Sequence, residues 1–186
     1  QQVVHTRGLH PGEPPTYTTS YTYTGGHQVA TIVHPSGRTE EFTYDANGNM
    51  ISRKLRQFPI SSQYLEVTRS YTSTFNLLQT QTDELGATTI YSYDSHGNLT
   101  RLDRPTVTTP SLQQAHADHV LNSRGQVTQV TDEEGRVTDY TYADTGPERG
   151  YLTQTAVHPT PTTTEATTFV HDELGRLLSR TEPWGG

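Results

Sequence analysis

The chain has 186 residues, a formal net charge of −7 and no cysteine. Its acidic balance argues against nucleic-acid binding, which needs clustered lysine and arginine. The missing cysteine excludes disulfides, thiolate zinc sites and thiol catalysis. No run of ten apolar residues occurs, so no membrane-spanning helix is predicted.

Aliphatic residues are scarce, and β-formers replace them. Ile, Leu, Val and Phe account for only 34 of the 186 residues, a composition that borders on disorder. Tyr occurs 11 times and Thr 34 times, and both favour strands because aromatic and β-branched side chains suit a pleated surface. We therefore predict an all-β fold and exclude a helical bundle. Tyr, with an apolar ring and a water-facing hydroxyl, would suit a sheet with one solvated face.

Glycines and aromatic residues recur with a period of about 49 residues. Gly48, Gly97 and Gly146 are each 49 residues apart. The aromatic residues on the same period are Phe42, Tyr91 and Tyr140, and then Tyr44, Tyr93 and Tyr142. The predicted repeat units are 26–75, 76–124 and 125–174, with 1–25 ending a preceding unit and 175–186 starting a further one. We expect the chain to be a piece of a longer protein.

Asp or Asn followed three residues later by Gly marks tight turns within these units. The side-chain oxygen accepts a hydrogen bond from the turn backbone, and Gly takes the left-handed conformation that follows. The six pairs, in chain order, are Asp45–Gly48, Asp83–Gly86, Asp94–Gly97, Asn122–Gly125, Asp132–Gly135 and Asp172–Gly175. Further turns are predicted at 73–76 and 143–150.

The segments between the turns alternate as strands do. In residues 88–93, for example, Thr89, Tyr91 and Tyr93 share one face. Each unit is therefore predicted to contain short antiparallel strands joined by tight hairpins, a longer proline-containing connection and a return strand. The prolines of these connections are Pro59, Pro105, Pro110, Pro159 and Pro161. Residues 111–121 could form a turn or two of helix, but the periodic match of Val120 with Tyr71 favours a strand.

One motif resembles a known family. The run YSYDSHGNL over residues 91–99 resembles a YD repeat, the tandem motif of Rhs proteins. The run FTYDANGN over 42–49 is similar, with Phe42 in place of the first aromatic residue. The stretches 75–86 and 171–177 are similar too, so the resemblance extends from about residue 21 onward.

The pattern departs from the family in one place. Ala143 replaces the Asp and Pro147 the Asn, with extra residues around Gly146–Gly150. The resemblance implies a long β-sheet wound into a spiral and forming a hollow shell, as in bacterial Rhs proteins, Tc-toxin C components and teneurin ectodomains. In the toxins it implies a shell around an effector released from the protein's own C-terminus. No segment resembles the family's self-cleavage region or an effector domain.

Candidate chemical sites have simpler structural interpretations. The acidic runs 83–84 and 132–134 could bind a cation, but they lack the alternating ligands of a calcium loop and coincide with turns. His116 and Asp118 would share a strand face while His119 points away, and no third metal ligand is visible. We therefore predict no metal and no cofactor.

No motif for catalysis stands out. Serine-nucleophile elbows, phosphate loops and dinucleotide fingerprints are absent, and nothing selects one carboxylate pair for glycoside hydrolysis. Asn98 begins a glycosylation sequon but also occupies the repeat's Gly-Asn-Leu position. The arginines Arg38, Arg53, Arg101, Arg136 and Arg176 could bind carbohydrate or a protein, or pair across strands with turn carboxylates.

Two functions remain open from the sequence. The first is a structural segment, without enzymatic activity, of a shell wall that encloses a toxin or other polypeptide of a larger secreted or surface protein. Its partners would be the rest of its own chain and an enclosed C-terminal effector. The alternative is a surface adhesion module that binds glycan or a protein, with self-association through strand edges as a further possibility.

Overall fold

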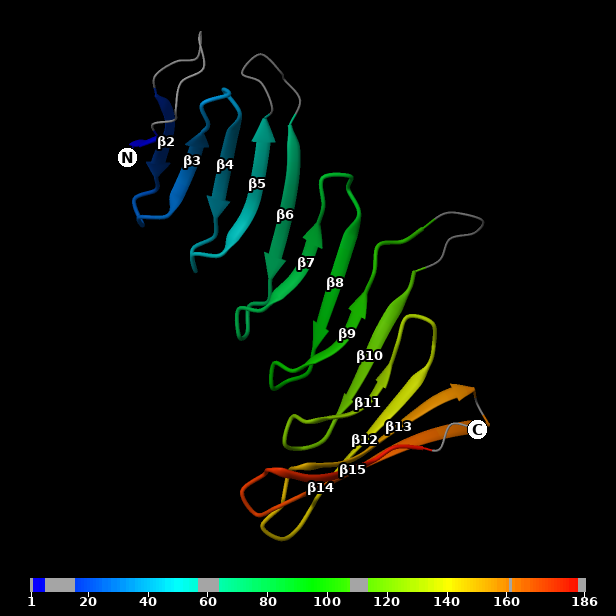
Figure 1. Cartoon of the computed structure of the whole chain (residues 1–186). Helices are drawn as coiled ribbons and strands as arrows, with labels where there is room; N and C mark the ends of the chain where they lie inside the picture. Colours follow the sequence, from blue (N-terminus) through cyan, green and yellow to red (C-terminus); the bar gives the residue numbers. More distant parts are fainter. Residues whose placement is uncertain (1, 6–15, 57–63, 108–113, 161, 184–186) are drawn as a thin grey trace, which may run out of the picture. The chain divides into compact units, whose positions relative to one another are not determined.

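The structure is a computed structural model, and it describes residues 2–5, 16–56, 64–107, 114–160 and 162–183 (Figure 1). Every regular element in this part of the chain is a β-strand, which confirms the all-β prediction. The strands are β1 (Gln2–His5), β2 (Tyr17–Tyr23), β3 (Val29–Val33), β4 (Thr39–Tyr44), β5 (Met50–Arg56), β6 (Leu65–Tyr71), β7 (Leu78–Thr82), β8 (Thr88–Tyr93), β9 (Leu99–Asp103), β10 (His116–Leu121), β11 (Val127–Thr131), β12 (Val137–Tyr142), β13 (Leu152–Thr160), β14 (Thr163–His171) and β15 (Leu177–Thr181).

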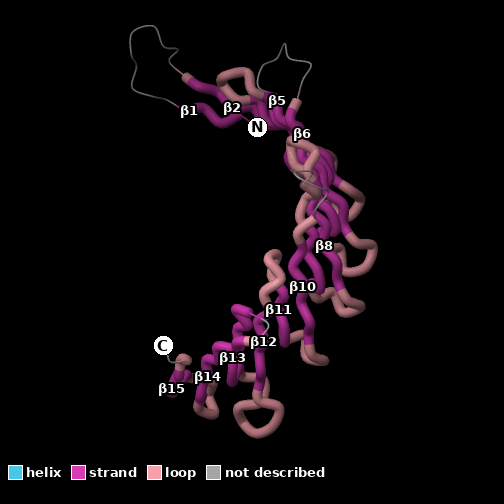
Figure 2. The backbone as a smooth tube through the Cα atoms, turned by 90° about the vertical axis from the view of Figure 1, so that its right-hand side faces the viewer, coloured by secondary structure: helices cyan, strands magenta, loops and turns pink. Residues whose placement is uncertain are grey.

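The contacts divide the chain into two units, Gln1–Ile90 and Tyr91–Gly186, with the boundary inside β8. Within each unit the strands lie side by side in sequence order and pair antiparallel with their neighbours. Figure 2 shows the strands of each unit as one layer, with turns at the strand ends. The repeat boundaries given above stay a prediction, since the two units do not coincide with them.

The two faces of the sheet in the first unit differ in chemistry. Residues directly opposite one another share a face, so the pairs Tyr21↔Ile32, Ile32↔Glu40 and Glu40↔Leu55 place mostly apolar side chains together. The other face carries hydroxyl pairs whose oxygens lie 2.6–2.9 Å apart. These pairs are Thr22–Thr31, Ser70–Thr80 and Thr82–Thr88. We call these the aromatic face and the hydroxyl face.

The second unit repeats this division. Tyr140 lies opposite Thr155, and Val157 lies opposite Thr138 on the aromatic face. Asp139 projects to the hydroxyl face with its partner Gln129. Because each unit is a single layer, few side chains are enclosed. Among the described residues only Val67 and Glu40 are buried, with 8% and 7% of their surfaces exposed.

Alternate turns share one end of the strands. We call the end that carries the turns after the even-numbered strands the turn rim. Next to this rim the β2–β3, β4–β5, β6–β7, β10–β11, β12–β13 and β14–β15 hairpins each show a register shift. Such a bulge leaves part of the backbone outside the regular ladder of hydrogen bonds. The opposite rim carries the tight turns 34–37, 83–86 and 132–135.

The structure bears out one predicted strand and contradicts one predicted connection. Residues 116–121 form strand β10, as the periodic match indicated, while 111–113 lie outside the described residues. The prediction of a third long proline-containing connection is wrong, because Pro159 lies inside β13, and Thr160 pairs with Thr163. The nine-residue strands β13 and β14 take up the length that a loop was expected to fill. Pro59, Pro110 and Pro161 lie outside the described residues.

Candidate functional site: the turn rim and its polar networks

The repeat Asp organises each turn through both carboxylate oxygens. At Asp45, Oδ1 accepts the backbone N–H groups of Asn47 and Asn49, each at 2.9 Å. Oδ2 accepts the Asn49 side-chain amide at 2.9 Å, and Gly48 N–H closes the turn on the Asp45 carbonyl at 3.1 Å. The same bonds recur at the turn of Asp94, where Asn98 takes the place of Asn49. The YDxxGN motif therefore describes a self-contained hydrogen-bonded loop.

The other predicted turns use the same side-chain oxygen. The Oδ1 atoms of Asp83, Asn122, Asp132 and Asp172 each accept two backbone N–H groups, two and four residues later in the chain. At Asp132 and Asp172 an arginine replaces the fourth-residue amide. Arg136 Nε and Arg176 Nε each lie 2.7 Å from the Oδ2 atom of that carboxylate. The predicted arginine–carboxylate pairing thus occurs across these two hairpins.

Sequence reasoning missed two turns and misjudged the extent of a third. Turns at 24–27 and 34–37 begin with Thr24 and His34 and so lack the Asp or Asn signal. The turn predicted at 73–76 is wider, because Thr72 N–H donates to the carbonyl of Leu77. Near Ala143, where the Asp is missing, the loop closes instead through Gly150 N–H to the Ala143 carbonyl at 2.8 Å.

Hydrogen bonds lower the pKa values of four turn carboxylates, those of Asp45, Asp94, Asp132 and Asp172. For Asp45 and Asp94 the largest cause is the side-chain amide of Asn49 or Asn98. For Asp132 and Asp172 it is the backbone N–H of Arg136 or Arg176. Because the folded pKa lies below the unfolded one, ionisation of these groups favours the folded chain.

This shift predicts acid sensitivity. The stabilisation is present above the unfolded pKa of about 3.9 and is lost as the pH falls through the lower folded values. We expect the urea midpoint to change little between pH 7 and pH 5 and to fall below pH 4. The control changes Asp45, Asp94, Asp132 and Asp172 to Asn, the residue that occurs naturally at 122. Its midpoint should fall less steeply with acid; an equally steep fall would contradict this assignment.

The side chain that follows the positive-φ residue of a turn, His27, Gly125 or Gly150, reaches the next turn along the rim. Gln28 Nε2 donates to the carbonyl of Gly48 at 2.8 Å, and Gln126 Nε2 donates to that of Gly150 at 2.8 Å. Tyr151 approaches Gly175 so closely that a Cβ there would lie 3.0 Å from its ring. A side chain at Gly48 or Gly175 would therefore press on the residue that reaches it from the neighbouring turn, as well as straining its own backbone.

The opposite rim differs. Added Cβ atoms at Gly86 and Gly135 would meet nothing within 4 Å. These glycines are therefore required only by their positive φ angles, 83° and 80°. The close approach of a neighbouring side chain to a turn glycine is thus seen on the turn rim, whereas on the opposite rim Arg104 forms an ion pair with Glu133 of the 132–135 turn.

Tyrosine hydroxyls form a second link next to the turn rim. Tyr44 donates to the carbonyl of Val29 at 2.8 Å, and Tyr142 donates to that of Val127 at 2.9 Å. Both carbonyls belong to the first residue of the preceding strand, where a register shift interrupts the ladder. The hydroxyl, expected from the sequence to face water, thus donates to the backbone of the adjacent strand.

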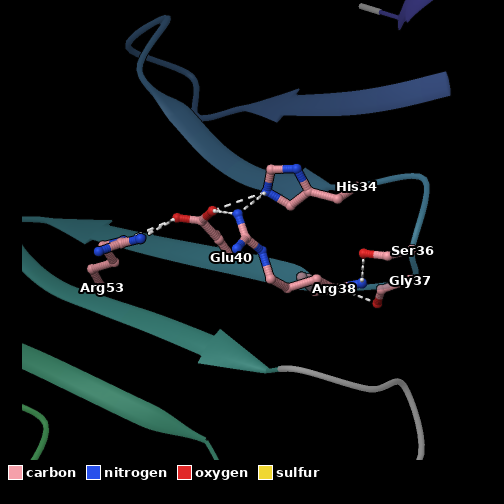
Figure 3. A network of polar contacts seen from close by, with 7 residues as sticks. His34, Ser36, Gly37, Arg38, Glu40 and Arg53 are labelled. Atoms are coloured by element: carbon pink, nitrogen blue, oxygen red, sulfur yellow. Dashed lines mark hydrogen bonds and ion pairs between the residues drawn. The ribbon is translucent and has the colours of Figure 1, made fainter. Parts of the chain in front are cut away.

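The most enclosed polar group of the first unit is the Glu40 carboxylate (Figure 3). Oε1 lies 2.9 Å from His34 Nε2 and 3.1 Å from an Arg38 nitrogen. Oε2 accepts two bonds from Arg53, at 2.9 and 2.7 Å. Burial by itself would raise the pKa of Glu40, but the bonds from Arg53 and His34 and the charges of the two arginines lower it overall. No sequence signal pointed to Glu40, although Arg38 and Arg53 were singled out.

Of the two histidines considered as metal ligands, His116 takes part in a polar cluster on the hydroxyl face. Arg101 bridges Asp103 at 2.9 Å and Asp118 at 3.2 Å, and His116 Nε2 lies 3.4 Å from Asp118. His119, one residue after Asp118, projects to the other face. Across the described ranges, no three His, Asp or Glu side chains are grouped so as to hold a metal ion.

Two further polar arrangements bear on the sequence-based candidates. Asp139 accepts from Gln129 at 2.8 Å and lies 2.8 Å from His158, a network that sequence reasoning missed. The sequon residue Asn98 already uses its amide nitrogen to bind Asp94. In the part of the chain that the structure describes, no helix has the length and apolar character needed to cross a membrane.

Comparison with known proteins adds family evidence. The family model described as RHS Repeat matches residues 73–111. Teneurin-1 of Gallus gallus is 30% identical over 105 residues, which cover 48% of this chain and 4% of that protein. This chain therefore corresponds to a small part of the relative it matches.

Solved structures share the fold at low sequence identity. The crystal structure of TcdB2-TccC3 superposes with a TM-score of 0.69 at 12% identity, covering 89% of this chain and 9% of that one. The Tc holotoxin pore of Photorhabdus luminescens gives a TM-score of 0.67 at 15% identity, covering 97% of this chain and 10% of that one. The turn and strand pattern described above thus recurs in much larger chains.

Proposed function

We propose that this chain is a segment of an Rhs/YD-repeat protein and that its sheet forms part of the wall of a shell that encloses a polypeptide. The observation that carries this proposal is that each unit, in its described residues, is a single-layer sheet with two chemically distinct faces. A wall needs such a layer, because one face must meet the interior and the other the exterior. The fold shared with TcdB2-TccC3 supports this assignment.

Hydrogen bonds at the turn rim would hold the strands of the wall together. A single layer lacks the second sheet that normally buries apolar surface, so its strands must be held by neighbouring strands alone. The Asp-centred turns and the Tyr hydroxyl bonds provide such links within and between hairpins. The residues that define the repeat, such as Asp45, Gly48 and Tyr44, thus fix the turns and hold neighbouring strands in place. We assign them no catalytic role.

The enclosed partner would be another part of the same longer polypeptide. The chain spans about one tenth or less of the proteins that it matches, so the wall would be completed by repeats outside these residues. We propose that the complete protein is secreted or displayed at a cell surface, as the family resemblance implies. We propose neither a cofactor nor an enzymatic activity for this segment.

Limited proteolysis of the full-length protein tests this function. We expect one segment to resist protease in the intact protein and to be digested at once when it is produced alone. Changing Asp45 and Asp94 together to Ala should open the wall and expose that segment, whereas the matched change to Asn should preserve its protection. The absence of a protected segment would contradict enclosure, and saturable glycan or protein binding by the sheet would then favour the adhesion module.

A further inference from the structure

The strand pair β9–β10 lacks links that hold its repeat-equivalent pair, β5–β6. The two pairs correspond because β5 begins at Met50 and β9 begins 49 residues later, at Leu99. Each pair lies wholly within one unit of the chain. The chain therefore contains an internal control for the effect of these links.

The first missing link is the tyrosine hydroxyl. Tyr71, at the end of β6, donates to the carbonyl of Met50 at 3.2 Å and so ties β6 to β5. The period of 49 matches Tyr71 with Val120, but the strand pairing shows that the corresponding residue at the end of β10 is Leu121, which likewise follows a register shift and lies opposite the first residue of the next strand. Leucine has no donor, so the carbonyl of Leu99 receives no such bond from it.

The second missing link is an amide pair on the turn rim. Asn49 and Asn76 exchange two side-chain hydrogen bonds, at 2.6 and 3.0 Å, between the turns that flank β5–β6. At β9–β10 the first amide is present as Asn98, but Gly125 replaces the second. A Cβ at Gly125 would lie 3.3 Å from Asn98 Oδ1, which shows that the two positions still face one another.

The missing side chain leaves a groove. A space of about 280 Å³ lies between the turns 94–98 and 122–125 and is lined by Asp94, His96, Asn98, Asn122 and Arg124. Arg124 donates to the Asp144 carboxylate and Gln126 donates to the carbonyl of Gly150, both in the following turn. These two side chains therefore do not bridge the groove.

The rest of the β9–β10 contact is also weaker. Three residue pairs are in register here, against four for β5–β6. Ala117 lies opposite Leu102, where the first unit has the buried Val67 opposite Arg53. The side chains of Arg101 and Asp118 form an ion pair across the strands and are 40% and 37% exposed. Ion pairs this accessible to water contribute little stability. Just beyond the strands, Arg104 N–H donates to the carbonyl of Ala115 at 2.8 Å, and Gln114 Nε2 donates to that of Arg104 at 3.1 Å.

We propose that β9–β10 is a seam that opens more readily than its repeat-equivalent pair β5–β6, which is locked. The seam arises from two substitutions within the repeat, Tyr to Leu at 121 and Asn to Gly at 125. Local opening of this kind follows the strength of local contacts and is independent of what the sheet encloses. The proposal therefore does not depend on the shell function.

Hydrogen exchange of the full chain measures the seam directly. We expect the amides of residues 99–103 and 116–118 to exchange at least about tenfold faster than those of 50–55 and 65–68, after correction for intrinsic rates. This comparison needs no mutation, because both pairs belong to the same molecule. Equal or slower exchange at β9–β10 would overturn the proposal.

Grafting the missing links tests their role. The double variant Leu121→Tyr, Gly125→Asn should remove most of the difference, since Asn tolerates the positive φ of 76° at position 125, as Asn76 does at 57°. The reciprocal variant Tyr71→Leu, Asn76→Gly should speed exchange in β5–β6 by about tenfold. Should the graft fail to fold, the reciprocal variant still decides. Unchanged exchange at β5–β6 in that variant would show that the links do not lock the strands.

Discussion

Changing Glu40 to Ala should lower the free energy of unfolding by about 2 kcal/mol. The Glu40 side chain is only 9% exposed, and its two oxygens accept bonds from His34, Arg38 and Arg53. Removing the carboxylate leaves these donors without their shared acceptor. The effect stays below that of a fully buried ion pair because the two arginines are partly exposed. Urea denaturation at pH 7 measures the change.

The adjacent residue provides a matched control. Glu41 belongs to the same strand, β4, but projects to the other face, where its oxygen lies 3.5 Å from Arg56 Nε. Such an exposed pair is worth at most a few tenths of a kcal/mol, so Glu41→Ala should change the free energy of unfolding by less than about 0.5 kcal/mol. Equal effects at positions 40 and 41 would show that the Glu40 network does not hold the sheet.

Changing Asp45 to Ala should also destabilise the chain, with a clear fall in the urea midpoint. The substitution removes one acceptor from two backbone N–H groups and one from the Asn49 amide. Asn49 in turn binds Asn76, so the loss should weaken two consecutive turns of the rim. Thermal and urea denaturation of the variant measure this effect.

Asn at position 45 keeps a side-chain oxygen that can accept the turn hydrogen bonds but removes the negative charge. Asn122 shows that an amide oxygen accepts the same two backbone bonds, from Arg124 and Gln126, at 2.9 and 3.1 Å. Asp45→Asn should therefore retain most of the stability, with a much smaller fall in the urea midpoint than Asp45→Ala causes. If Asn proves as damaging as Ala, the negative charge, and not the turn hydrogen bonds, is what position 45 contributes.

The sequence predicts the turns well because their bonds are local. The side chain of Asp45 reaches only as far as Asn49, so its role follows from spacing within one motif. The strand class follows from composition and from alternation over six residues. These features need no knowledge of how distant segments meet.

The links between hairpins could not be predicted in the same way. Tyr44 meets Val29 across 15 residues and Asn49 meets Asn76 across 27, so both depend on strand register and on the bulges beside the turns. The Glu40 network escaped detection for another reason: the positions 49 and 98 residues later hold Thr89 and Thr138, so repetition gives no signal.

The proposed function requires that this sheet is part of a wall around an enclosed polypeptide. Cryo-electron microscopy of the full-length protein tests it most directly. The account predicts that strands β2–β15 are continuous with further repeats around an internal space, and that this space contains density for another segment of the same chain. A sheet with both faces open to bulk solvent and no enclosed chain would contradict it.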